Sequence, residues 1–93
     1  MKIEVKYLGH LRDELGTEES FDFFGDSNPH PLREILAEMI QQKGIIFSRK
    51  IYEEEGRFNP HITVIINGRA ILNDQVLVPD GASLLFIPFV DGG

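Results

Sequence analysis

Apolar and charged side chains alternate strictly over residues 2–7 at the start of the chain. A period of two is typical of a half-buried β-strand, so we expect a strand there. Residues 18–24 place Phe21 and Phe23 on one face and predict a second strand. A connection of about ten residues separates the two segments, which favours an opening hairpin with a wide loop.

A single apolar stripe at helical spacing follows the breaker-rich segment 26–31. Its members are Leu32, Ile35, Leu36, Met39 and Ile40. Pro31 suits the first helical position, because the N–H that proline lacks has no partner there. Gly44 suits a C-cap. The pattern predicts one main helix between these two residues.

The second half of the chain reads mainly as strands. Residues 45–60 show no clear period, and we interpret them as a surface excursion. Residues 62–66 are β-branched throughout, which is typical of a central strand buried on both faces. Asn67-Gly68 predicts a type I′ turn leading into residues 70–72. Residues 76–78 form a short extended piece, and residues 83–88 form the last strand.

This order of elements predicts the α+β class and a β-grasp (ubiquitin-like) layout. One main helix packs on one face of a mixed sheet of four to five strands, because a single amphipathic helix has to cover an apolar sheet face. We expect a single domain over residues 1–88 and a flexible tail over residues 89–93. Pro88 has no N–H to donate to a ladder, so we expect pairing to stop there.

Charge and composition limit the classes of partner. The formal net charge is −6 and the pI is about 4.9, which argues against nucleic acid or anionic lipid and favours a basic protein surface. No apolar run approaches the roughly 20 residues that a membrane helix needs. Charged residues interrupt the first apolar run, so we expect no secretory signal and a cytoplasmic location.

No constellation within residues 1–88 resembles an enzyme active site. The spacing of His10, His30 and His61 fits no metal motif, and the chain has no cysteine, so we expect no metal site. Neither a nucleophile elbow nor a phosphate-binding glycine motif is present. We therefore expect no bound cofactor, and we look for chemistry elsewhere in the chain.

The final residues offer that chemistry. Gly92 and Gly93 form a slender, conformationally free end that presents a carboxylate. Residues 89–93 span at most about 16 Å when extended, enough to enter a partner's active site. Phe89 and Val90 follow the last strand, and exposed apolar residues there are best explained by docking. A carboxylate must be activated, for example as an acyl adenylate made by a partner that uses ATP. It can then take up sulfur as a thiocarboxylate or be attacked by an amine.

Three segments resemble the MoaD/ThiS family of ubiquitin-like sulfur carriers. They are residues 3–13, residues 64–69 and residues 80–93, which ends on the two glycines. The nearer similarity is to the sulfur carrier, or small, subunit of molybdopterin synthase. The chain departs from that family's pattern by having Phe89 in place of a second proline, Ala82 in place of an acid, and Asp91 beside the glycines.

The resemblance implies a carrier without an active site of its own, which becomes the small subunit of molybdopterin synthase when it pairs with a large subunit. A ubiquitin-activating-type adenylating enzyme would use ATP to activate Gly93 and convert it to a thiocarboxylate for molybdenum or tungsten cofactor synthesis. The residues that it implies for partner contact are Tyr7, Pro88, Phe89, Val90, Asp91 and Gly92. Tyr7 corresponds to a docking face in the family, although its place here fits the core equally.

Three other functions share the same fold and stay open at this point. The first is sulfur delivery to thiamine or to tRNA thiolation. The second is a protein modifier whose Gly93 forms isopeptides with lysines. The third is a β-grasp interaction module with an idle tail.

Overall fold

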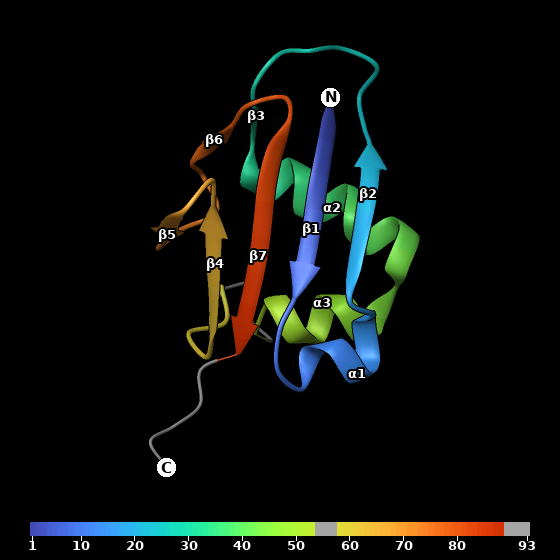
Figure 1. Ribbon diagram of the computed structural model, residues 1–93, viewed down its shortest axis with the longest axis vertical. Helices are drawn as coiled ribbons and strands as arrows, with labels where there is room; N and C mark the ends of the chain where they lie inside the picture. The colour runs from blue at the N-terminus through green and yellow to red at the C-terminus, as the bar shows by residue number, and fades with distance from the viewer. Residues whose placement is uncertain (54–57, 89–93) are drawn as a thin grey trace.

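The computed structural model describes residues 1–53 and 58–88 of the chain (Figure 1). In chain order its elements are β1 (Lys2–Tyr7), α1 (Leu11–Leu15), β2 (Glu18–Asp22), β3 (His30–Pro31), α2 (Leu32–Lys43), α3 (Ile45–Ile51), β4 (Ile62–Ile66), β5 (Arg69–Ile71), β6 (Leu77–Val78) and β7 (Ala82–Pro88).

A five-stranded sheet in the order β2-β1-β7-β4-β5 forms the centre of the fold. The first and last strands, β1 and β7, run parallel, whereas every other neighbouring pair in this sheet is antiparallel. The helices lie on one side of the sheet and leave its other side open (Figure 1). The predicted α+β class with a mixed sheet is therefore confirmed.

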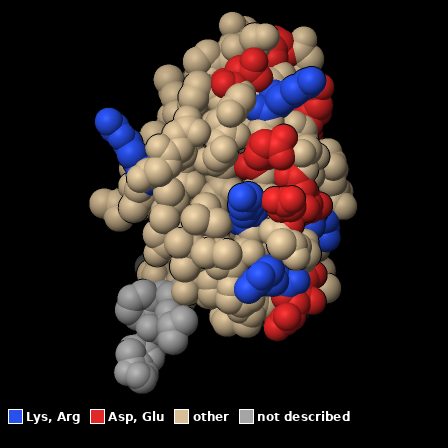
Figure 2. All heavy atoms as spheres, in the orientation of Figure 1, with Lys and Arg blue, Asp and Glu red and all other residues tan. Residues whose placement is uncertain are grey.

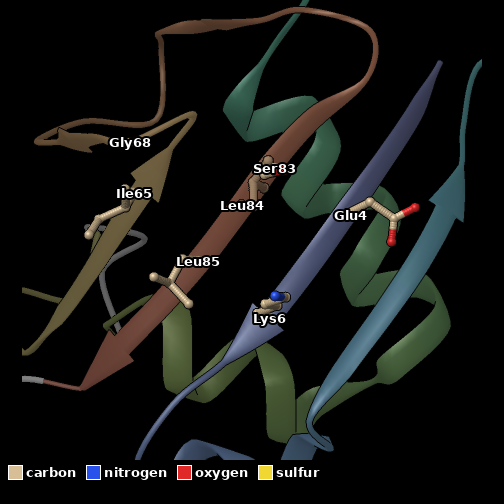
Figure 3. Close-up of a pocket in the computed structure, with 7 residues that line it drawn as sticks. All are labelled: Glu4, Lys6, Ile65, Gly68, Ser83, Leu84 and Leu85. Atoms are coloured by element: carbon tan, nitrogen blue, oxygen red, sulfur yellow. The ribbon is translucent and has the colours of Figure 1, made fainter.

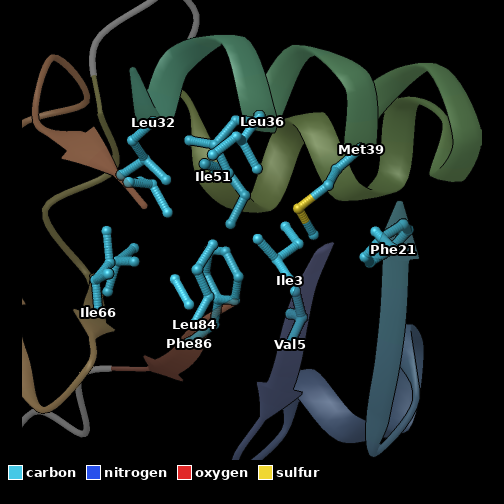
Figure 4. Packing of buried hydrophobic residues seen from close by; sticks show 14 of the residues in the cluster. Ile3, Val5, Phe21, Leu32, Leu36, Met39, Ile51, Ile66, Leu84 and Phe86 are labelled. Atoms are coloured by element: carbon cyan, nitrogen blue, oxygen red, sulfur yellow. The ribbon is translucent and has the colours of Figure 1, made fainter. Parts of the chain in front are cut away.

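Apolar residues alternate with exposed residues along the strands, and the apolar ones form the core between the sheet and the helices. In β1, Ile3, Val5 and Tyr7 are buried, while the charged residues between them are exposed. Figure 4 shows side chains from β1, β7 and β4 meeting those of α2 and α3 in one continuous cluster. The largest fully buried side chains are Tyr7, Phe47, Phe86, Ile3, Leu11, Leu32, Ile35, Leu36, Met39, Ile51, Leu84 and Val5.

Helix α2 confirms the predicted helical stripe. Its core-facing residues Leu32, Ile35, Leu36 and Met39 are buried. The helix begins at Leu32, one residue later than expected, because Pro31 keeps an extended backbone and pairs with β6. Gly44 ends it with φ +86°, and its N–H donates to the carbonyl of Ile40 at 2.7 Å.

The interpretation of residues 45–60 as a surface excursion is wrong for α3. Phe47 and Ile51 are fully buried, and the Phe47 ring lies edge-on to that of Phe86 at 6.0 Å. Ile45 and Ile46 remain 65% and 57% exposed. Two core contacts one helical turn apart are too few to reveal a clear period in sequence, so the segment was assigned to the surface.

Strand β4 is buried on one face only, which corrects the expectation of burial on both. Ile62, Val64 and Ile66 face the core, whereas the residues between them are half-buried on the open side of the sheet. The turn after β4 agrees with the type I′ prediction, because Asn67 and Gly68 both have positive φ, +49° and +84°.

A small second sheet joins β3 to β6, with His30 opposite Val78. Strands of two residues leave no readable period, so the sequence did not predict this pairing. None of the helices in the described segments combines the length and apolar character that crossing a bilayer requires.

Candidate functional site

The central strand β7 carries the chain toward its carboxyl-terminal residues. It pairs with β1 on one side and with β4 on the other, with Tyr7 opposite Phe86 and Ile62 opposite Pro88. The strand is described as far as Pro88, which is buried, and the end of β7 lies at the lower rim of the sheet in Figure 1. The remaining residues of the predicted site, Phe89, Val90, Asp91, Gly92 and Gly93, lie outside the described residues.

A turn packs tightly against the end of β7. The N–H of Leu8 donates to the carbonyl of Phe86 at 3.0 Å, so the turn after β1 is hydrogen-bonded to the last strand. Gly9 follows with φ +58°, and a Cβ built on it would lie 2.8 Å from Cγ of Pro88. The position of Pro88 is thus constrained by strand pairing and by close contact with this turn.

Tyr7 lies in the core and not on a docking surface. Its side chain is 0% exposed and its ring stacks on Phe86 at a centroid distance of 5.6 Å. The hydroxyl donates to Oε2 of Glu19 at 2.8 Å, and Nζ of Lys43 lies 2.6 Å from the same oxygen. Burial, together with the Glu19 carboxylate, raises the pKa of Tyr7. Tyr7 therefore supports the tail-bearing strand from below and offers no surface to a partner.

The open face of the sheet carries an apolar patch across its central strands. Register places Lys6, Leu85, Ile65 and Ala70 in one row across β1, β7, β4 and β5. Leu85 and Ile65 are half-buried and point away from the core (Figure 3). We call Leu85, Ile65 and Ala70 the open-face patch.

A shallow hollow of about 240 Å³ lies over this patch. It is lined by Glu4, Lys6, Ile65, Gly68, Ser83, Leu84 and Leu85 (Figure 3). Glu4 on its rim accepts a hydrogen bond from Oγ of Ser20 at 2.6 Å, which holds the carboxylate over β2. The hollow therefore combines an apolar floor with a charged rim, the arrangement of a protein-docking surface.

Charged side chains gather on one half of the open face. Figure 2 shows acidic and basic residues over the β1–β2 side, and mainly uncharged surface over β7 and β4. In this charged half Lys6 lies opposite Glu18, and Lys2 lies opposite Asp22. The face is thus divided into a polar and an apolar half that meet along β1.

His30 sits in a local ion-pair cluster at the other end of the molecule. Its Nε2 lies 2.9 Å from Oδ1 of Asp26, its Nδ1 lies 3.4 Å from Oε1 of Glu34, and its ring stacks on Phe24 at 3.9 Å. The hydrogen bond to Asp26 raises the pKa of His30, and the same bond lowers the pKa of Asp26. These contacts join the β2–β3 loop to the start of α2, so the cluster has a structural role.

Within residues 1–53 and 58–88 no three acidic or histidine side chains come together in a way that would hold a metal ion. The open-face patch was missed in the sequence. Its signal was present, because apolar residues stand at outward positions of residues 62–66 and 83–88, where an alternating strand should be polar.

Comparison with known proteins gives structural neighbours only, since no protein-family model and no curated protein matches the chain. SAMP1 from Haloferax volcanii superposes with a TM-score of 0.79, at 22% identity over 100% of both chains. A protein assigned as molybdopterin converting factor subunit 1, from Pyrococcus furiosus, gives 0.68 at 21% identity over 97% of this chain and 99% of its own.

A third neighbour comes from the Amycolatopsis orientalis BexX/CysO complex, with a TM-score of 0.72 at 24% identity over 98% of this chain and 99% of that one. The three superpositions cover nearly the whole chain, and their TM-scores establish its fold. The chain therefore has the ubiquitin-like β-grasp fold of MoaD/ThiS-type carriers and modifiers, the group that its sequence resembles.

Proposed function

We propose that this protein is a ubiquitin-like sulfur carrier for molybdenum or tungsten cofactor synthesis, with the Gly93 carboxylate as its reactive group. The observation that carries the proposal is the place of β7. This strand pairs with β1 as far as Phe86 and with β4 as far as Pro88, and residues 89–93, which end on Gly92 and Gly93, follow it in the sequence. A folded domain whose last strand ends at its rim can present the glycine-ended segment that follows. This arrangement suits the insertion of a carboxylate into another protein's active site.

The activation step needs a partner enzyme and ATP, with no catalytic residue from this chain. A carboxylate oxygen of Gly93 attacks the α-phosphorus of ATP, and the bond to pyrophosphate breaks, which gives an acyl adenylate. Hydrosulfide, or an equivalent sulfur donor, attacks the acyl carbon and AMP leaves. The product is a thiocarboxylate, and no electrons are transferred. Both steps take place in the cytoplasm under this proposal.

The delivery step takes place in a synthase large subunit. The thiocarboxylate sulfur bonds to an electrophilic carbon of a pterin precursor and displaces an oxygen leaving group. Water then cleaves the resulting thioester, which restores the Gly93 carboxylate and leaves the sulfur on the acceptor. Phe89, Val90 and Asp91 contact the entrance of the partner's site, and Gly92 passes through its narrowest part.

The open-face patch supplies the domain contact with the adenylating enzyme. Leu85 and Ile65 offer apolar surface next to Lys6, with Glu4 further along the rim of the hollow, so the matching partner surface carries an apolar protrusion flanked by charges of both signs. The net charge of −6 favours the approach of a partner that is basic overall. The neighbour solved as a BexX/CysO complex supports, in general terms, a partner for a chain of this fold.

The choice of pathway rests on the end of the sequence and on one structural neighbour. The Pro88-x-Val90 ending and the neighbour assigned as a molybdopterin converting factor favour the pterin acceptor. Delivery to thiamine or tRNA requires the same thiocarboxylate and is the alternative within this class.

Protein modification is the second candidate, and a specific observation favours it. Besides the SAMP1 structure described above, two further structural neighbours are described as small archaeal modifier protein 1, from Haloferax volcanii and Methanosarcina acetivorans. In that reaction a lysine amine attacks the acyl adenylate in place of sulfur, and an isopeptide bond forms through Gly93.

The deciding experiment is the intact mass of the protein purified from its native host, with fragmentation of the carboxyl-terminal peptide. The carrier proposal expects one oxygen replaced by sulfur at Gly93. Recovery only as conjugates to lysines would favour the modifier. An unmodified terminus in cells that are actively making the cofactor would overturn the proposal.

A matched variant separates the chemistry from the fold. One extra alanine after Gly93 moves the carboxylate by one residue and leaves residues 1–88 unchanged. We expect it to unfold at the same denaturant concentration as the native chain and to release no pyrophosphate with the activating enzyme. Co-purification with a synthase large subunit then tests the pathway.

A further inference from the structure

We propose that Gly9 is a positioning residue that sets the direction in which the chain leaves the sheet at Pro88, and with it the efficiency of carboxylate activation. This inference rests on the proposed function. It arises from a contact between residues that are far apart in sequence, at the point where the domain ends and the reactive segment begins.

The contact is closer than any side chain would allow. A Cβ on Gly9 would lie 2.8 Å from Cγ of Pro88 and 3.4 Å from its Cδ. Carbon atoms in contact are normally about 3.5–4.0 Å apart, so even alanine would force one partner to move. Gly9 also has φ +58°, a conformation that side-chain-bearing residues rarely adopt.

The other described glycines lack this second constraint. Gly16, Gly25, Gly44, Gly68 and Gly81 all have positive φ, and at each of them a Cβ would meet nothing within 4 Å. Backbone conformation alone thus explains these five. Among the glycines that the structure describes, Gly9 is the one that also touches the end of β7.

The contacts around Gly9 and Pro88 determine which of the two residues moves when alanine replaces Gly9. Phe86 is held by its ring contacts with Tyr7 and Phe47, and its carbonyl accepts the N–H of Leu8. The turn is tied further, because the carbonyl of Gly9 accepts the N–H of Arg12 at 3.1 Å. Pro88 lies opposite Ile62 of β4, but it is the last residue of β7 and has no N–H to donate to the ladder. Strain at the Gly9–Pro88 contact is therefore relieved most easily by rotation of Pro88 and of the chain that follows it.

A small rotation at Pro88 has a large effect at the terminal carboxylate. The five residues after Pro88 reach at most about 16 Å, so a rotation of about 10° at their base displaces an extended end by about 3 Å. Misplacement of a reacting atom by about 1 Å is enough to lower a rate a hundredfold. Partial adjustment within the tail reduces this loss, and we expect at least a tenfold fall in kcat/KM for adenylation.

The test compares Gly9→Ala with Gly25→Ala. The control glycine has φ +70° with open space around it and lies in the β2–β3 loop, at the opposite end of the molecule (Figure 1). Both variants place alanine in the left-handed region and share that cost in stability, to which Gly9→Ala adds the cost of its contact with Pro88. The measurement is ATP-dependent pyrophosphate release by the activating enzyme of the same organism, at varied carrier concentration, beside the free energy of unfolding.

We expect kcat/KM to fall at least tenfold for Gly9→Ala and to stay within twofold of native for Gly25→Ala. Repeating the Gly9→Ala change in a Pro88→Ala background removes Cγ and Cδ from the contact. There the additional loss caused by alanine at position 9 should disappear, as a double-mutant cycle for a direct contact requires. Equal activity of the two single variants, or a full additional loss in the Pro88→Ala background, would overturn the inference.

A second measurement separates failure of the inference from failure of the proposed function. If the native chain releases no pyrophosphate, the proposed function is wrong. The positioning role is then decided by NMR of the free chain. Gly9→Ala should shift the amide resonances of Phe89 and Val90, whereas Gly25→Ala should leave them in place. Unchanged resonances in both variants would refute the role of Gly9.

Discussion

The two faces of the five-stranded sheet are built from the same strands and differ in nearly every other respect. On the covered face, residues such as Val5, Phe86 and Val64 are fully buried against the helices. On the open face, their neighbours Lys6, Leu85 and Ile65 are exposed or half-buried. One residue step along each strand thus separates a position that stabilises the fold from one that is available to a partner.

The open face itself departs from the usual polar exterior of such a sheet. Its β1–β2 half carries charged residues, as alternation predicts, whereas its β7–β4 half carries the open-face patch. Apolar residues retained where solvent would favour polar ones are typical of an interaction surface. The comparison teaches that stability and recognition can be altered separately in this protein, by substitution on one face or on the other.

The largest expected effect comes from adjacent residues of β7. Phe86→Ala removes a fully buried ring that contacts Tyr7 and Phe47, and we expect a loss of about 3–5 kcal/mol in the free energy of unfolding. Leu85→Ala, on the open face, should cost less than about 1 kcal/mol. Urea denaturation of both variants measures the difference, and equal losses would break the distinction between the faces.

The second prediction concerns recognition. Leu85→Asp places a charge in the centre of the open-face patch, so affinity for the activating enzyme should fall tenfold to a hundredfold, about 1.4–2.8 kcal/mol. Gln41→Asp adds the same charge at an exposed position of α2, on the helical side, and serves as the control. Titration calorimetry with the enzyme measures both, and similar losses would mean that net charge decides binding.

A smaller effect is expected on the covered face, near the end of β1. Tyr7→Phe removes the hydroxyl that donates to Glu19, while Lys43 still pairs with that carboxylate. We expect a loss of about 1 kcal/mol in the free energy of unfolding and unchanged pyrophosphate release. Tyr52→Phe, which loses a similar bond to Asp74, is the matched control for the stability change. Impaired activation in Tyr7→Phe at normal stability would place Tyr7 among the partner contacts after all.

The smallest effect is the pH dependence of the His30 cluster, which lies away from both faces. Since the pKa of His30 is raised above 6.5 in the folded chain, its contribution is complete below that value and is lost as pH rises through the folded pKa. Asp26 has a pKa below its ordinary value of 3.8, so its contribution is complete above that value and is lost as pH falls through the folded pKa. The stability difference between the native chain and His30→Gln should therefore be larger at about pH 5 than at about pH 9. If the stability difference between the native chain and His30→Gln did not change with pH, the ion pair of His30 would make no contribution to stability.

Local patterns predicted the elements that carry their own signal. The stripe of α2, the alternation of residues 2–7 and the Asn67-Gly68 turn each depend on a few neighbouring residues, and each is present in the structure. Tyr7 is in phase with Ile3 and Val5, so its burial was readable from the alternation. The docking role was predicted for Tyr7 only because of the resemblance to a family.

Other features depend on contacts that no local pattern records. In helix α3 only Phe47 and Ile51 are buried, too few for a readable period. The β3–β6 pair joins two segments of two residues each. Of the candidate site, the Gly92-Gly93 end stays a prediction because it lies outside the described residues, and the sequence analysis overlooked the open-face patch. The contact of Gly9 with Pro88 joins residues near the two ends of the sequence, so only the folded structure reveals it.

The parallel pairing of β1 with β7 also has a mechanical consequence. A partner that pulls on the tail while holding the start of the chain draws these two strands past each other, since both run in the same direction in Figure 1. The load then falls along the strands and is shared by the whole ladder at once, instead of opening it one bond at a time. Forced extraction is limited by the rate of unfolding. Under the proposed carrier function, a domain held in this way resists being unravelled by a partner that draws in its tail, and it stays folded for the next round of sulfur transfer.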